Sequence, residues 1–316
     1  MPKPILGDAE FIVLFEKYGA TELARIIGIN VRNVFMRRAR IEKKSGASVL
    51  NPEAAQWLSR YPSRVPFTIE TGTVLIASDA HYWPGVITTA HRGFVKFIEN
   101  LKPDHVVMNG DVFDGARASR HPRIMWEHSP TIKQELEAVS DRLHEIVKAN
   151  PKAKHLWTIG NHDSRFESSL SNNSADYENV QGFALRDHFP LWEMALSFWI
   201  NTDVVVKHRF KGGIHATHNN TLWSGKTMVT GHLHSLKVTP YSDYTGLRFG
   251  VDTGTLTVPS TDAPGGPQTN YNEDNPQNHR SGFIVLTFKD GLLLWPEIAY
   301  VVDEGLICFR GQITSV

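Results

Sequence analysis

The sequence predicts an α/β fold preceded by a small all-helical domain. Short apolar runs typical of buried strands alternate with longer segments of helical pattern between Thr73 and Ile159. Beyond residue 240 the pattern is mostly that of strands, whereas residues 1–48 are helical in pattern and rich in basic side chains. We therefore divide the chain into a helical domain at 1–48, a connector at 49–72 and an α/β domain at 73–316.

The composition narrows the class of protein. The chain has 316 residues, of which 41% are hydrophobic and 21% charged, as expected for a globular protein with a buried core. Its single cysteine, Cys308, excludes a disulfide framework and a thiolate cage for a metal. No apolar run approaches the roughly 20 residues of a membrane helix, and the N-terminus lacks a secretory signal. We expect a cytoplasmic protein with no membrane partner.

Positive charge is concentrated near the N-terminus, although the formal net charge is zero. Eight basic and two acidic residues lie between Lys17 and Lys44, a net charge of +6, so the remainder of the chain carries −6. A local cationic block on a neutral chain indicates a polyanionic partner. The alternative is an ordinary solvated helix face.

Residues 8–46 have the pattern of a helix-turn-helix. One helix ends at Gly19, a second is capped by Thr21 and ends at Gly28, and Asn30 can cap a third. The pattern resembles the DNA-binding helix-turn-helix. On that interpretation the recognition helix presents four side chains to DNA: Arg32, Asn33, Arg37 and Arg38. The alternative is a helical hairpin that packs on its neighbour or on a second copy of the chain in a homodimer.

Metal-ligating side chains close five of the predicted strands. The five fragments are Asp79-Ala80-His81, Gly110-Asp111-Val112-Phe113-Asp114, Gly160-Asn161-His162-Asp163, Ile214-His215-Ala216-Thr217-His218 and Gly231-His232-Leu233-His234. In the first and last fragments, a spacing of two places the ligand side chains on one side of an extended chain. Ligands gather at the carboxyl ends of strands in α/β folds, so we expect the five fragments to converge.

This order of motifs (DxH, GDxxD, GNHD, a lone His and GHxH) resembles the calcineurin-like metallophosphoesterase family over about residues 73–256. The resemblance implies a four-layer α-β-β-α sandwich, in which two mixed sheets carry a two-metal centre at their strand ends. It implies seven metal ligands: Asp79, His81 and His234 for one ion, Asn161, His218 and His232 for the other, and Asp111 as the bridge. It also implies that His162 handles the leaving-group proton and that Asp114 orients it.

The chemistry of the ligands agrees with this resemblance. Oxygen and imidazole ligands without thiolate suit Mn²⁺, which we favour, and also Fe, Zn²⁺ or Ni²⁺. Two such ions can clamp a phosphoryl group and convert a shared water to hydroxide near neutral pH. A His positioned by a carboxylate can then protonate the leaving oxygen. We expect Gly160 to let the backbone turn, so that Asn161 and His162 both point inward.

Some positions have more than one interpretation. We prefer His218 to His215 as the lone His, because His218 closes its predicted strand. Nine other histidines, including His208 and His279, are interpreted as surface or satisfied core groups. Three arginines just past the motifs are candidates to hold a substrate phosphate, or else ordinary surface residues: Arg117, Arg120 and Arg165.

The substrate is less defined than the chemistry. The motif GDVFDG lacks the Asp-Arg-Gly ending typical of Ser/Thr protein phosphatases. A helix-turn-helix joined to such a domain looks like phage or prophage proteins, which would place it in the host cytoplasm, and favours nucleic acid. We therefore predict a phosphodiesterase or nuclease directed to DNA or nucleotides. The alternatives are a phosphomonoesterase acting on nucleotides or phosphoproteins, and a DNA-binding regulator whose phosphoesterase domain senses a ligand.

Overall fold

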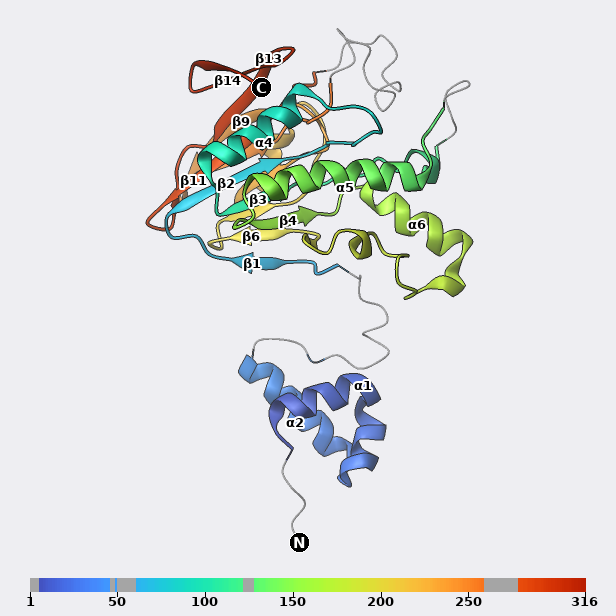
Figure 1. Ribbon diagram of the computed structural model, residues 1–316. Coiled ribbons are helices and arrows are strands. Elements are labelled where there is room, and N and C mark those ends of the chain that lie inside the picture. Colours follow the sequence, from blue (N-terminus) through green and yellow to red (C-terminus); the bar gives the residue numbers. More distant parts are fainter. Residues whose placement is uncertain (1–5, 46–48, 50–60, 122–127, 259–277) are drawn as a thin grey trace. The chain divides into compact units, whose positions relative to one another are not determined.

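The computed structural model describes residues 6–45, 49, 61–121, 128–258 and 278–316 (Figure 1). The chain forms two compact units, Met1–Arg60 and Tyr61–Val316. Residues 61–72, which we assigned to the connector, therefore belong to the second unit. Most of the expected polar loop at 260–282 lies outside the described residues. No helix in the described ranges combines the length and the apolar character needed to cross a membrane.

The described residues of the first unit form the helices α1 (Asp8–Ile27) and α2 (Val31–Ser45). Gly19 has φ 73° and ψ 175°, so α1 is broken into two helical segments at the predicted glycine. Gly28 ends α1 in the left-handed conformation, and the Asn30 side chain accepts a hydrogen bond of 2.8 Å from the Arg32 amide. The expected helical segments are therefore present, with Gly28 and Asn30 in their expected roles, while their DNA-binding nature stays a prediction.

Two of the four arginine and asparagine side chains expected to face DNA instead hold this unit together. The Arg37 guanidinium donates to the Leu6 carbonyl, lies 3.2 Å from Asp8 and packs over the Phe11 ring. Arg38 pairs with Glu42 at 3.0 Å and lies over Phe15. Both arginines follow the buried Val34 by three or four residues, which places them on the inward-facing side of α2. Arg32 and Asn33 are exposed, as expected.

The second unit is built on two sheets. One has the strand order β1 (Val65–Phe67), β6 (Phe198–Ile200), β7 (Val204–Val206), β8 (Thr227–Thr230), β10 (Gly246–Asp252) and β9 (Lys237–Asp243). The other has the order β15 (Gln312–Ser315), β14 (Leu306–Phe309), β13 (Glu297–Asp303), β11 (Gly282–Lys289), β2 (Gly72–Ala77), β3 (His105–Met108), β4 (Lys154–Thr158) and β5 (Glu193–Ala195), with β12 (Leu292–Leu293) beside β11. Both sheets mix parallel and antiparallel pairs, which confirms the α/β class.

The helices of this unit are α4 (Thr89–Leu101), α5 (Ile132–Ala149), α6 (Asp163–Asn173) and α7 (Ala216–Ser224), with short 3₁₀ turns η1 (Ala116–Ala118), η2 (Ala175–Tyr177) and η3 (Leu185–His188). The sequence around residues 178–200 has a helical pattern, but the helix that it predicts is wrong, since η3, β5 and β6 occupy this segment. The strand that we predicted at residues 212–218 is also wrong, because α7 begins at Ala216. Helix α7 packs closely against β10, because the Thr217 carbonyl lies where a side chain on Gly250 of β10 would stand.

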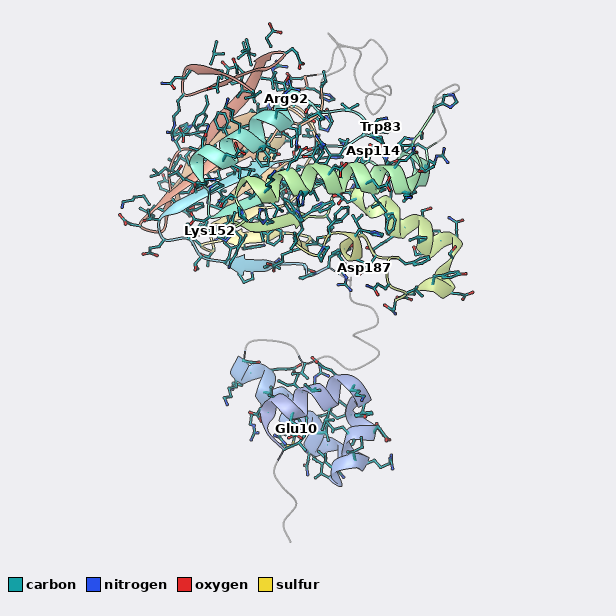
Figure 2. All side chains as sticks on the ribbon, in the orientation of Figure 1. Glu10, Trp83, Arg92, Asp114, Lys152 and Asp187 are labelled. Carbon is teal, nitrogen blue, oxygen red and sulfur yellow. The ribbon has the colours of Figure 1, made fainter. Side chains whose placement is uncertain are left out.

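Alternation along β2 divides the core between the two faces of its sheet. Val74 and Ile76 pack toward the other sheet, together with Val204 and Val229. Leu75 and Ala77 face the opposite way, toward the residues of α4 and α5 that cover this face (Figures 1 and 2). Strands β2, β3 and β4 run parallel, as do β7, β8 and β10. The segments that follow them therefore emerge at the same ends of the sheets. The four-layer description stays a prediction.

Candidate metal centre

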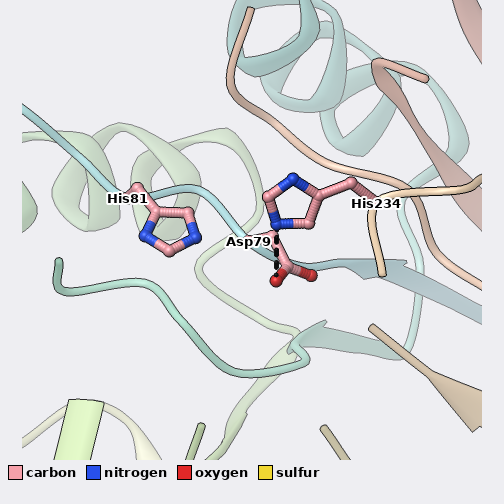
Figure 3. Close-up of side chains that lie close together, drawn as sticks. All are labelled: Asp79, His81 and His234. Carbon is pink, nitrogen blue, oxygen red and sulfur yellow. Dashed lines mark hydrogen bonds and ion pairs between the residues drawn. The ribbon is translucent and has the colours of Figure 1, made fainter. Parts of the chain in front are cut away.

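Most of the motif residues meet in one place. Asp79 and His81 follow β2, Asp111 follows β3, Asn161 follows β4, and the GHLH segment follows β8. Three groups of side chains in the described residues bring candidate ligand atoms within 4.8 Å of one another: Asp79, His81 and His234; Asp111, His208 and His232; and His81, Asp111 and His162. The first group is the set of three expected for one metal ion (Figure 3).

The first group is buried and already ordered. Nε2 of His234 lies 3.0 Å from Oδ1 of Asp79, and the His81 and His234 rings are 5.7 Å apart. Burial raises the pKa of Asp79, but His234 and His208 beside it lower the value to about 2. Asp79 is therefore an anionic oxygen ligand at neutral pH, the form that a divalent cation requires.

The second group contains atoms that fit a bound cation. Nδ1 of His208 lies 2.8 Å from the Asn109 carbonyl, which leaves Nε2 directed at Asp111 Oδ2, 3.0 Å away. Within the described part of the chain, neither His208 Nε2 nor the buried Asn161 Oδ1 has a hydrogen-bond partner. Burial lowers the pKa of His208, but Asp111 and Asp79 raise it to about 10. The site therefore attracts positive charge, and its orphaned ligand atoms fit a metal.

His208 occupies the place that we gave to His218. The structure puts His218 on the surface of α7, where its ring lies 5.4 Å from that of Tyr241, and His215 directly precedes the same helix. The expectation for His218 is therefore corrected. His208 lies two residues after the apolar run of β7. The sequence pattern extends the predicted strand through His208, so we did not select it as a metal ligand.

Asp114 joins the metal centre to the expected proton donor. Its Oδ1 lies 2.8 Å from His81 Nδ1 and 3.0 Å from His162 Nδ1. Burial raises the pKa of Asp114, but hydrogen bonds from these two histidines hold it well below its usual range. Arg165 Nη2 lies 3.1 Å from His162 Nε2, so this arginine is at the site. Arg117 is exposed and donates to the Ser129 carbonyl instead.

The backbone around the ligands is strained. Five of the candidate ligand residues have the left-handed conformation, with φ between 41° and 72°: Asp79, His81, Asp111, His232 and His234. Such conformations are costly for residues other than glycine and concentrate at functional sites. Gly160 serves a different purpose from the turn that we expected. A Cβ there would stand 2.2 Å from Asp111 Oδ1, so glycine is needed for close approach.

Two buried carboxylates escaped the sequence analysis. Asp163 accepts hydrogen bonds from the backbone on both sides of the site, including the amides of Asp111 and Gly160. Glu135, in the first turn of α5, accepts from the amides of Gly115 at 2.7 Å and Ala116 at 3.2 Å, next to Asp114. Burial, together with the charge of Asp114, raises the pKa of Glu135 to about 7.

Comparison with known proteins agrees with the family that the motifs resemble. The sequence profile described as calcineurin-like phosphoesterase matches residues 72–251, more than half of the chain. The chain belongs to the calcineurin-like phosphoesterase family. No curated protein matches it.

Solved structures with a similar fold include an archaeal phosphodiesterase at 12% identity and TM-score 0.37, covering 72% of this chain and 99% of that one. A phosphoesterase from E. coli, YfcE, has 15% identity and TM-score 0.34, covering 71% and 97%. Vps29 from Chaetomium thermophilum has 10% identity and TM-score 0.40, covering 77% and 96%.

The two histidine assignments can be separated by metal analysis. We expect His208→Ala to lose bound divalent metal, because it removes a buried ligand atom beside Asp111. His218→Ala is the matched control and should retain the metal, since its ring is exposed on α7. Elemental analysis of both variants after loading with Mn²⁺ measures this. Loss of metal in His218→Ala with retention in His208→Ala would reverse the assignment.

Glu135 should make stability depend on pH. Its folded pKa of about 7 lies above its ordinary value of 4.5, so folding favours the neutral form. The resulting stabilisation is full below pH 4.5 and is lost as pH rises through 7, a change of about 3 kcal/mol. Glu135→Gln stays neutral and should lack this loss. Urea unfolding of both proteins at pH 5 and pH 8 tests the difference, and parallel pH profiles would contradict it.

Proposed function

We propose that this protein is a metal-dependent phosphodiesterase that acts on DNA. The observation that supports the metal chemistry is the buried Asn161 Oδ1, which has no hydrogen-bond partner in the described part of the chain, together with His208 Nε2 directed at the carboxylate of Asp111. Divalent ions held there would activate a water molecule for attack and neutralise the phosphoryl oxygens. Mn²⁺ is the favoured metal because the ligands are oxygen and imidazole only, and Fe, Zn²⁺ or Ni²⁺ are alternatives.

The ligands divide between two ions. Asp79, His81 and His234 would hold one, in agreement with their grouping in the structure. Asn161, His208 and His232 would hold the other, with Asp111 between the two sets. The amide of His162 donates to Asp111 Oδ1 at 2.7 Å, while Oδ2 faces His208. One oxygen of the bridging carboxylate is thus fixed by the backbone of the GNHD segment.

His162 is oriented to deliver a proton. Its Nδ1 lies against Asp114, so Nε2 is the nitrogen that can meet a leaving oxygen. The anionic Asp114 would stabilise the imidazole when it carries two protons. Arg165 lies at the same Nε2 and can exchange this contact for a non-bridging phosphate oxygen of the substrate. The attack by water, the neutralisation of charge on the phosphate and the protonation of the leaving oxygen would then each depend on a different group.

Removing His162 should separate metal binding from catalysis. His162→Ala leaves every proposed ligand in place, so the metal content should persist while turnover falls by roughly 10²–10⁴-fold. The loss should be smaller for aryl phosphodiesters with good leaving groups, which need less protonation. Steady-state rates across a series of aryl leaving groups measure this. An equal loss for good and poor leaving groups would assign His162 another role.

The first unit supports DNA as the target. α2 carries six basic residues and one acidic residue. Arg37 and Arg38 are engaged internally, whereas Arg32, Asn33 and Arg40 remain exposed. Arg32 and Asn33 lie at the start of α2, immediately after the turn, where a recognition helix contacts base edges. We therefore assign DNA contact to the exposed residues of α2.

Binding of duplex DNA tests this assignment. We expect affinity to fall steeply with salt, and Arg32→Ala to weaken binding and lower the salt slope by about 1. Arg25→Ala is the matched control, because Arg25 is exposed on α1 and paired with Glu22. Fluorescence anisotropy at several salt concentrations measures both. Absence of salt-sensitive binding would make α2 an assembly surface and favour a nucleotide or phosphoprotein monoester as the substrate.

A further inference from the structure

The segment that carries His208 also carries an exposed surface of alternating basic and aromatic side chains. We call it the basic-aromatic surface; its residues are the half-buried Lys207 and the exposed Arg209, Phe210, Lys211, Ile214 and Trp223. They belong to the loop between β7 and α7 and to the end of α7. All of them lie within the second unit, outside the set of metal ligands.

Direct contacts make this surface continuous. The Lys207 ammonium lies 5.3 Å from the centre of the Phe210 ring. Lys211 lies 5.4 Å from the same ring and 4.5 Å from the Trp223 ring. The side chain of Lys211 therefore links the loop to α7, and cations alternate with rings across the surface.

Its apolar groups are unusually exposed. Trp223 is 70% exposed, Ile214 is 77% exposed and Phe210 is 44% exposed. Exposure of several large apolar side chains at one place marks a binding surface more often than an inert one. A ring that is mostly open to solvent has a face free for stacking.

The charge of this surface is uncompensated. Between Val204 and Gly225 the sequence has three basic residues and no carboxylate. The nearest acidic residue in the sequence, Asp203, is paired with Lys226 at 3.3 Å. In the parts of the chain that the structure describes, Lys207, Arg209 and Lys211 have no ion pair. These three cations differ in this respect from Arg37 and Arg38, and they remain available to an anionic partner.

The surface adjoins the metal centre. Lys207 and Arg209 are the chain neighbours of His208, whose Nε2 lies 3.0 Å from Asp111. A chain of phosphates cleaved at the metals would therefore pass the cations of this surface.

We propose that the basic-aromatic surface binds the single-stranded DNA that is cleaved at the metal centre. The proposal rests on the proposed phosphodiesterase function and specifies its substrate as an unpaired strand. Bases stack on aromatic side chains only when their faces are free, which excludes paired bases, and the lysines and arginine match the phosphates. A base that stacks on Trp223 would displace Lys211 from the ring and free it to pair with a phosphate.

Strand binding and strand cleavage test the proposal with the full chain loaded with Mn²⁺. We expect Trp223→Ala to weaken binding of a single-stranded oligothymidine roughly 5- to 100-fold. Trp223→Phe keeps an aromatic face and should recover most of that affinity. Lys211→Ala should lower the salt slope by about 0.7, the single-strand value for one phosphate contact. Tyr177→Ala and Lys133→Ala are matched controls, since both residues are exposed on η2 and α5.

The kinetic readout distinguishes the two proposals. kcat/KM for the oligonucleotide should fall roughly 5- to 100-fold in Trp223→Ala, whereas kcat/KM for a small aryl phosphodiester should be unchanged. If wild-type protein with Mn²⁺ fails to hydrolyse the small diester, the proposed function is wrong, whatever the strand binding shows. If it hydrolyses the small diester but Trp223→Ala and Lys211→Ala bind and cleave the oligonucleotide normally, the present inference is wrong.

Two further experiments test which molecule binds the basic-aromatic surface. Single-stranded RNA of the same length should bind no more tightly than DNA, and a clear preference for RNA would overturn the assignment to DNA. Light scattering of wild type and Trp223→Ala should give the same mass. A mass that falls on substitution, with unchanged strand binding, would make this surface a contact between copies of the chain.

Discussion

The buried carboxylate of Asp163 fixes the metal centre. It accepts hydrogen bonds from the amides of Asp111 at 2.9 Å, Val112 and Phe113 at 3.0 Å, and Gly160 at 2.8 Å, and from the Trp157 indole at 3.0 Å. One side chain therefore ties the turn after β3 to the turn after β4. Without it, four buried backbone donors would lose their acceptor, each at a cost of about 1–3 kcal/mol.

This anchor explains how strained backbone persists at the ligands. Asp79 and His81 continue the pairing of β2 with β3 beyond the strands, since their amides donate to the carbonyls of Gly110 and Asp111 at 2.9 Å. The turn that carries Asp111 is held in its left-handed conformation from one side by Asp163 and from the other by these bonds. Ligands preset in this way need little rearrangement to take up a cation.

The sequence predicted those parts of the site that depend on strand ends. Asp79 and Asp111 converge because they follow the neighbouring parallel strands β2 and β3, and His234 follows β8, which is parallel to β7. His208 was missed because a His after an apolar run occurs twice in this region, and only tertiary packing decides which run is a strand. Local pattern cannot show that Thr217 meets Gly250 and begins a helix. The roles of Gly160 and Asp163 likewise depend on a contact across about fifty residues.

The number of basic residues in a segment does not show which of them are available to bind a polyanion. Arg37 and Arg38 belong to the dense cationic block near the N-terminus. Both pack over aromatic rings of the small core of the first unit, Arg37 over Phe11 and Arg38 over Phe15. The loop after β7 has only three basic residues, but none is paired within the described structure. Cations that fold a domain are not free to bind a polyanion, whereas cations without an ion pair can neutralise the phosphates of one. The position of these three cations beside His208, and the fact that none of them is paired within the described structure, therefore support our assignment of the DNA strand to this surface. The number of basic residues does not.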